Sequence, residues 1–178
     1  MLESHVEIFN RERHPSTAQL EAVCDLFRTT VPVFDDESTS ENSETIALRK
    51  TPDDYRRLLE VKTLLLICEE NEGIAGLLEW DPRDKEQVLL AYITWMLVNR
   101  NSQGQGLSTK LHRHFEQTCV PAVVEHAQKT VYQALAVHLK NPALNIYRKW
   151  GYSEEGAPQW NDGRRLFMIK APLADENT

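Results

Sequence analysis

Two glycines stand at the point where a strand-like run gives way to a helix-like pattern. Gly104 and Gly106 follow the apolar run 88–98 and precede a helical pattern that begins at Leu107. The first N–H groups of a helix have no partner within it and carry the positive end of its dipole. Because glycine lets another group approach such a helix end closely, the spacing favours phosphate binding. A tight turn without a ligand explains the glycines equally well.

Two common phosphate-binding loops do not match this stretch. A Walker loop needs a glycine directly before its lysine, but Thr109 precedes Lys110. A dinucleotide-binding fingerprint needs a third glycine at Thr109 and opens its fold, whereas this loop follows several predicted strands. A phosphate loop of another class is therefore required.

The segment QGQGLS, residues 103–108, resembles the Arg/Gln-x-x-Gly-x-Gly/Ala loop of the GNAT superfamily, which moves acetyl groups from acetyl-CoA to amines. Ser108 departs from the glycine or alanine at the last position. The resemblance implies acetyl-CoA as cosubstrate, with the CoA pyrophosphate held by the loop amides. The cofactor-binding residues it implies here are Gln103, Gly104, Gln105, Gly106, Leu107, Ser108 and Thr109.

A second segment, LAVHLKNPALNIYRKWGY at residues 135–152, is similar to a later motif of the same family. The positions in register are Asn141, Ala143, Tyr147, Gly151 and Tyr152. The two motifs together imply an α/β, GNAT-like acyl-CoA N-acyltransferase fold. That fold has a mixed central sheet of about seven strands flanked by about four helices. It would cover residues 1–178 as a single domain.

The resemblance also assigns chemical roles. Tyr147 matches the general acid that protonates the departing CoA thiolate, although its helical stripe with Ala143 and Ile146 fits a core tyrosine too. Asn141 precedes Pro142, which is typical of a helix N-cap, and by resemblance it contacts the pantetheine arm. The backbone N–H groups of Met96 and Val98 would face the thioester carbonyl and the pantetheine amide, respectively.

The general base is less well marked. An attacking amine must lose a proton, and many relatives supply a carboxylate from the strand before the loop. The run 88–98 contains no carboxylate, and the glutamate of histone-type relatives corresponds to Tyr92. Glu79 and His138 are the candidate bases, acting directly or through a water chain, and a structural role fits both.

The histidines of the helix after the glycine loop, the cysteines and the acidic stretch fit structural or solvent-exposed roles better than catalytic ones. Residues two apart on a helix point about 200° apart, so His112 and His114 cannot share a metal ion, and we expect a solvated face and no metal. Cys24, Cys68 and Cys119 are far apart in sequence and predict neither a disulfide framework nor a nucleophile. The acidic stretch 35–44 fits a solvated loop better than an acceptor site.

The elements that position these residues follow from periodicity and caps. Ser16 and Gln19 have capping-box spacing for a helix that ends at Val31-Pro32, and Thr51-Pro52 begins another. We expect strands at HVEIFN, TLLLIC, IAGLLEW, VLLAYITWMLV, TVYQALAVHL, GYSEEGAPQW and RRLFMIKA, the last two joined by the turn NDG. Helices are expected from residue 107 to about Pro121, continuing after a kink, and at PALNIYRKW.

Composition limits the partners. The net charge of −7 argues against nucleic acid, and for a charged substrate it favours a cation. No apolar run is long enough to cross a bilayer, and no leader pattern opens the chain, so we expect no membrane partner and a cytoplasmic location. A homodimer is left open.

We therefore predict an N-acetyltransferase that moves acetyl from acetyl-CoA to a primary amine by direct attack in a ternary complex. The acceptor would be a small-molecule or peptide amine, with cationic amines favoured by charge. The alternative is a non-catalytic acyl-CoA-binding sensor or interaction module of the same fold. A larger acyl donor also stays open.

Overall fold

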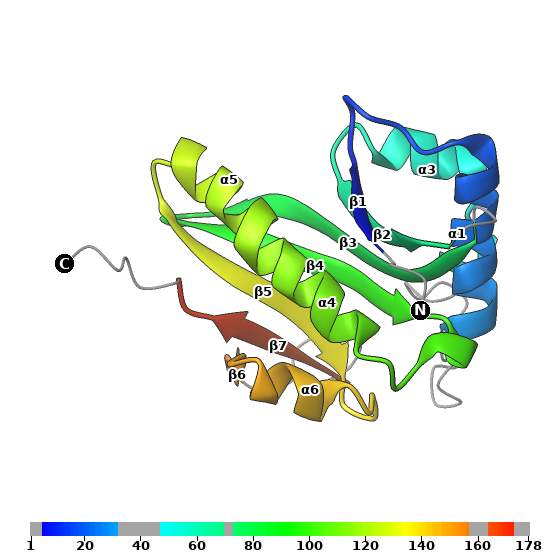
Figure 1. Ribbon diagram of the computed structural model, residues 1–178. Coiled ribbons are helices and arrows are strands. Elements are labelled where there is room, and N and C mark those ends of the chain that lie inside the picture. The colour runs from blue at the N-terminus through cyan, green and yellow to red at the C-terminus, as the bar shows by residue number, and fades with distance from the viewer. Residues whose placement is uncertain (1–4, 32–46, 70–72, 157–163, 173–178) are drawn as a thin grey trace. The chain divides into compact units, whose positions relative to one another are not determined.

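The strands of the protein form one mixed seven-stranded sheet in the order β1-β2-β3-β4-β5-β7-β6 (Figure 1). The computed structural model describes residues 5–31, 47–69, 73–156 and 164–172. These residues belong to two compact units: unit 1 comprises 1–79 and 95–115, and unit 2 comprises 80–94 and 116–178. Strands β3 (Ile74–Lys85) and β4 (Val88–Val98) contribute a part to each unit. The predicted α/β fold is confirmed.

Two capped helices enter unit 1. Helix α1 (Thr17–Thr30) begins with a reciprocal capping box, in which the Ser16 hydroxyl accepts from the Gln19 N–H and the Gln19 side chain accepts from the Ser16 N–H. Helix α3 (Pro52–Leu58) repeats this arrangement between Thr51 and Asp54. Each box satisfies two backbone donors that a helix start leaves open. Both predicted helix starts are confirmed.

The sheet of unit 1 is apolar on both faces. Strand β1 (Val6–Phe9) pairs antiparallel with β2 (Thr63–Cys68), in the register Val6↔Ile67 to Phe9↔Leu64. Leu64 and Leu66 join the core cluster that α1 and α3 cover. Ile67, with the opposite parity, approaches Gly76 together with Leu111 of α4 (Leu107–His114). Because both faces are covered, β2 reads as a continuous apolar run rather than an alternating one.

Unit 2 is built on β5 (Thr130–His138). One edge of β5 pairs in parallel with β4, from Val88↔Thr130 to Ile93↔Leu135, and the other edge pairs antiparallel with β7 (Arg165–Lys170). The two-residue strand β6 (Ser153–Glu154) adds to β7, and α5 (Val120–His126) packs against β5. One face of this sheet carries the cluster of Leu90, Tyr92 and Ala134.

Where a kink was predicted, the helix changes to a π-helical hydrogen-bonding pattern. Helix α4 ends at His114, residues Phe115–Cys119 form the π-helix η2, and α5 carries Pro121 in its first turn. Proline has no N–H to donate to the carbonyl four residues earlier, so the hydrogen-bonding pattern must change before it. None of the described helices is long and apolar enough to span a membrane.

Strand β3 is longer than its apolar pattern predicts, because polar contacts extend it. Arg83 donates to Asp81 at 2.7 Å, and Thr94 of β4 donates to Asp81 at 3.0 Å. The Arg83 guanidinium lies 3.6 Å from the centroid of the Tyr92 ring. These pairs hold β3 against β4 beyond Trp80.

The C-terminal elements are shorter than predicted. Helix α6 covers only Leu144–Lys149, and β6 covers two residues of the predicted strand GYSEEGAPQW. The predicted turn NDG and the acidic stretch 35–44 lie outside the described residues.

Candidate functional site

The glycine loop leads directly into α4. Gly104 and Gly106 have φ of +77° and +76°, in the left-handed region that favours glycine, and Gly106 is the N-cap. A Cβ atom built on either residue would meet nothing within 4 Å. Torsion therefore requires these glycines, while the space beside them is open to a ligand. Residues 103–106 are all exposed.

Polar contacts hold the loop at the end of β4. The Gln103 side-chain amide donates to the Val98 carbonyl at 3.2 Å, and the Asn99 N–H donates to the Ala75 carbonyl at 2.9 Å. Gly106 has no side chain to cap the first N–H groups of α4. The amides of Leu107 and Ser108 are thus placed to serve an anion.

Met96 and Val98 lie on the part of β4 that follows its ladder with β5. The last paired positions are Ile93 and Leu135, and β4 continues to Val98. Hydrogen bonds of that ladder therefore do not use the N–H groups of Met96 and Val98. Both side chains are half-buried.

Tyr147 lies on α6 in unit 2 and is 7% exposed. Its ring packs edge-on against Trp150 and Tyr152, with centroid distances of 5.8 and 6.1 Å. Burial raises the pKa of Tyr147 to about 12. The hydroxyl therefore stays protonated at neutral pH, as a proton donor requires.

Asn141 supports the turn before α6 rather than its N-cap. The helix begins at Leu144 with Ala143 as N-cap, so the predicted N-cap position is wrong. The Asn141 side-chain oxygen accepts from the Ala143 N–H at 2.9 Å, and its carbonyl accepts from the Leu144 N–H at 3.1 Å. Asn141 thus orders a separate turn, because residues 142 and 143 are not yet helical.

Of the two candidate bases, Glu79 lies in unit 1 and is fully buried. Its Oε1 accepts from the Lys62 ammonium at 2.6 Å, and Lys50 Nζ lies 4.0 Å from Oε2. Oε2 has no hydrogen-bond partner among the described residues. A carboxylate in this state is paired in charge but retains one acceptor oxygen.

His138 ends β5 in unit 2 and is also buried. Its Nδ1 accepts from the Lys140 N–H at 3.1 Å, which requires the neutral ring to carry its proton on Nε2. The lone pair that would take a proton is thus already engaged. Tyr92, which the sequence comparison above set against a glutamate of histone-type relatives, is buried, and burial raises its pKa.

The other reactive residues have structural surroundings. His112 is 2% exposed and packs 6.3 Å from the Phe115 ring, so the predicted solvated face is wrong at this position. The three cysteines are free thiols, and burial raises the pKa of each. The described residues contain no group of three or more histidine, cysteine, aspartate or glutamate side chains that could hold a metal ion.

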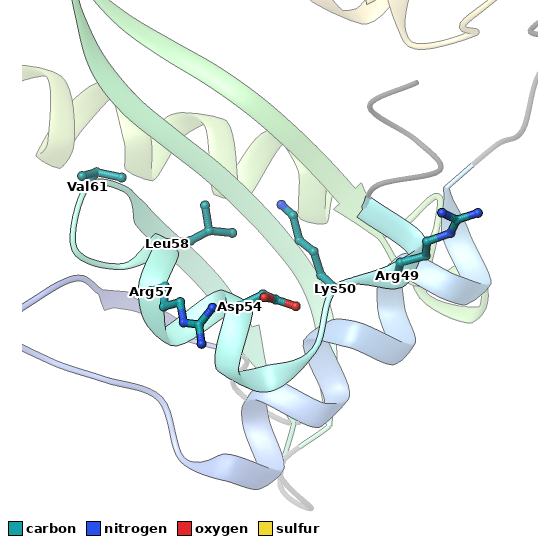
Figure 2. Close-up of a pocket in the computed structure, with 6 residues that line it drawn as sticks. All are labelled: Arg49, Lys50, Asp54, Arg57, Leu58 and Val61. Atoms are coloured by element: carbon teal, nitrogen blue, oxygen red, sulfur yellow. The ribbon is translucent and has the colours of Figure 1, made fainter. Parts of the chain in front are cut away.

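A pocket in unit 1 was not predicted. It has a volume of about 470 Å³, and Figure 2 shows Asp54, Arg57 and Leu58 on α3 with Lys50 beside them. Arg49 and Val61 complete the described lining. The basic residues flank the Thr51 cap in the sequence, and their clustering around a helix start was the available signal.

The predicted site residues divide between the units. Unit 1 contains Glu79, Met96, Val98 and the loop 103–109. Unit 2 contains Asn141, Tyr147 and His138.

Comparisons with known proteins agree with this fold. The PaiA N-acetyltransferase from Thermoplasma acidophilum, solved with coenzyme A, has a TM-score of 0.64 at 15% identity, covering 94% of this chain and 99% of its own. An aminoglycoside 6'-acetyltransferase type Ii has a TM-score of 0.66 at 15% identity, covering 96% and 99%. A chain of the NatC complex bound to Gag peptide and CoA has a TM-score of 0.62 at 15% identity, covering 97% and 100%.

No curated protein matches the chain by sequence. The family model described as the acetyltransferase (GNAT) domain, however, matches residues 33–171, which include β4, the glycine loop and α6. The chain belongs to the GNAT family of acetyltransferases.

Proposed function

We propose that this protein transfers the acetyl group of acetyl-CoA to a primary amine by direct attack in a ternary complex. The observation that carries the proposal is the loop at residues 103–109, with two left-handed glycines at an uncapped helix start and open space beside them. Two structures of the same fold, the PaiA enzyme and the NatC complex, contain CoA.

The residues of the loop fit this cosubstrate. The N–H groups at the start of α4 would hold the CoA pyrophosphate, with Val98 and Asn141 contacting the pantetheine arm. Bound acetyl-CoA supplies a thioester, whose carbonyl carbon accepts the amine nitrogen while its carbon–sulfur bond breaks. The Met96 N–H would stabilise the charge on the carbonyl oxygen in the transition state.

Tyr147 would donate the proton that the leaving sulfur takes up. Its pKa of about 12 lies above that of a free thiol, about 8.5, so donation is uphill in water. A thiolate that forms in the same desolvated surroundings also becomes more basic, which narrows the difference. The amine loses one N–H proton, Tyr147 recovers a proton, and the products are an amide and a thiol.

Glu79 is the better of the two candidate bases. Its Oε2 retains an acceptor position, whereas Nδ1 of His138 is engaged by a backbone N–H. Because Glu79 is fully buried, we propose that it accepts the proton through water rather than by contact with the amine.

The single domain and the cytoplasmic location stay predictions.

Release of CoA thiol from acetyl-CoA, followed across a panel of amines, tests this function. Blanks with protein alone account for its own cysteines, and calorimetry measures acetyl-CoA binding in parallel. Release with one class of amine supports the enzyme, and succinyl-CoA run alongside fixes the acyl group. Tight binding without release on a broad panel would favour the acyl-CoA sensor, and absent binding would reduce the glycine loop to a turn.

A further inference from the structure

The pocket beside α3 is cationic in an acidic protein. Of its six described lining residues, three are cationic and one is acidic, although the whole chain has a net charge of −7. The cationic three are Arg49, Lys50 and Arg57. A ligand in the pocket would lie a few ångströms from these three charges, where their attraction is strong. Surface charges farther away than about 8 Å are largely screened at physiological salt.

Lys50 is the desolvated member of the three. Its side chain is 16% exposed, and its Nζ lies 5.1 Å from the centroid of the Tyr55 ring and 5.9 Å from that of Phe27. The Glu79 carboxylate lies 4.0 Å from Lys50 but is hydrogen-bonded to Lys62. Two ammonium groups thus lie near one buried carboxylate, and the hydrogen bond to it comes from Lys62 rather than from Lys50.

Asp54 adds a negative charge near Lys50, but its hydrogen bonds go to Thr51. Its carboxylate accepts from the Thr51 N–H at 2.9 Å and from the Thr51 hydroxyl at 2.8 Å. These bonds lower the pKa of Asp54 and commit the group to the helix cap. A ligand anion in the pocket would therefore pair with Lys50 directly.

Other features of the pocket suit an organic anion. Leu58 and Val61 give it an aliphatic wall. A site with cationic groups and an aliphatic wall fits a small organic carboxylate better than a bare inorganic ion.

The pocket is linked to the proposed reaction centre within unit 1. Lys50 contacts the Phe27 ring, and that ring meets the Trp95 ring edge-on at a centroid distance of 5.4 Å. Trp95 directly precedes Met96, whose N–H is the proposed oxyanion contact. Two side chains therefore separate the pocket from the strand where the thioester would lie.

We infer that this pocket binds a carboxylate carried by the acceptor amine, with Lys50 and Arg57 as its charged partners. The inference rests on the proposed function and names its substrate class: amines that also bear a carboxylate many bonds away from the amine, as in acidic peptides. It replaces the cationic acceptor expected from net charge. Simple cationic amines would lack the group that the pocket recognises.

Binding should be linked to proton uptake. Burial lowers the pKa of Lys50, and a bound carboxylate would raise it again. The groups that face Lys50 are Cys24 of α1, Asp54 and Tyr55 of α3, Lys62, and Glu79 of β3. The acidic groups among these raise the pKa of Lys50, and Lys62 lowers it. A bound carboxylate would raise the pKa of Lys50 further.

A binding experiment tests the pocket without catalysis. N-acetyl-L-leucine carries a carboxylate, N-acetyl-L-leucinamide is its uncharged match, and inorganic phosphate is a second anion. We expect the acid to bind wild type roughly tenfold to a hundredfold more tightly than the amide, as for a hydrogen bond to a charged group. Lys50→Met and Arg57→Gln should each weaken the binding of N-acetyl-L-leucine by a similar factor.

Arg56→Gln is the matched control. Arg56 neighbours Arg57 on α3 but pairs with Asp53 and Thr17 and does not line the pocket, so its loss should leave binding unchanged. Equal binding of acid and amide, no binding of either, or an equal loss in the control would overturn the inference. Lys50-dependent binding of phosphate but not of carboxylates would overturn it as well. Arg57 is exposed, so its variant keeps the test valid if Lys50→Met does not fold.

Turnover then separates this inference from the proposed function. A peptide with a glutamate side chain and the same peptide with glutamine in its place form the matched pair, and spermidine and kanamycin serve as cationic amines. Preference for the carboxylate-bearing member, with a KM that rises in Arg57→Gln while that for acetyl-CoA does not, supports the inference. Release only with cationic amines would refute it and keep the enzyme. Acid-selective binding without release from any amine would refute the function alone.

Discussion

Replacement of Tyr147 with phenylalanine should remove catalysis while leaving the fold intact. The ring keeps its edge-on contacts with Trp150 and Tyr152. The Tyr147 hydroxyl makes no hydrogen bond to a described residue, so its removal leaves no described donor or acceptor without a partner. We expect the free energy of unfolding to change by less than about 1 kcal/mol.

The effect on turnover should be far larger. General acid catalysis contributes roughly a hundredfold to ten-thousandfold, which corresponds to about 2.7–5.5 kcal/mol of transition-state stabilisation. Because the hydroxyl acts on the departing sulfur, the dissociation constant of acetyl-CoA should change by no more than about twofold. Steady-state kcat and calorimetric affinity, measured on the same preparation, separate the two quantities.

The pH profile gives a second readout. With a pKa of about 12, Tyr147 is protonated throughout the neutral range, so its own titration should not lower kcat below about pH 11. If kcat of the wild type fell near pH 9 and that limb vanished in the phenylalanine variant, the assigned pKa and its cause would both be wrong. Unchanged kcat in the variant would remove Tyr147 from the proton-donor role.

Tyr152→Phe is the matched control for this experiment. The Tyr152 hydroxyl donates to the Gln133 side chain at 3.0 Å, and Gln133 in turn donates to Glu116 at 3.1 Å. Loss of this buried hydroxyl leaves the Gln133 oxygen without its donor and should destabilise the protein by about 1–3 kcal/mol. Stability should thus fall in this variant, with kcat retained, the reverse of the pattern for Tyr147.

Three further outcomes follow from the structure. Gly106→Ala should cost about 1–2 kcal/mol of stability, because φ is +76°, and should weaken acetyl-CoA binding. Thermal unfolding with and without acetyl-CoA measures both effects. If acetyl-CoA raised the melting temperature of wild type and variant equally, the loop would have no role in binding. Glu79→Gln should destabilise by about 3–5 kcal/mol in urea, since Lys62 loses a buried partner. N-acetyl-L-leucine should bind more weakly as pH rises, because Lys50 has a lowered pKa and binds an anion only when protonated; affinity that rises with pH would contradict this.

Local determinants made much of the fold predictable. The Ser16 and Thr51 capping boxes need only residues three positions apart, and both helices begin where the pattern indicates. The torsional demand at Gly104 and Gly106 is equally local. Features of this kind depend on backbone geometry that neighbouring residues alone determine.

Features that depend on distant residues were missed. The extension of β3 rests on Asp81 and Thr94, which meet only across the paired strands. The Lys62–Glu79 pair joins a residue before β2 to one on β3, and no spacing rule predicts it. The cationic pocket was missed for the same reason, since Lys50 gains its desolvated surroundings from α1 and β3 as well as from α3.

Net charge and local charge act at different ranges in this protein. A total of −7 biases the approach of a charged molecule from afar, and this bias weakens as salt increases. Selection between bound ligands depends instead on groups within a few ångströms, where desolvation strengthens each interaction. Lys50 is such a group, and the buried carboxylate nearest to it already accepts a hydrogen bond from another lysine. An amine that also carries a carboxylate is favoured at both distances. The net negative charge of the protein attracts its ammonium group from afar, and the cationic pocket binds its carboxylate at contact.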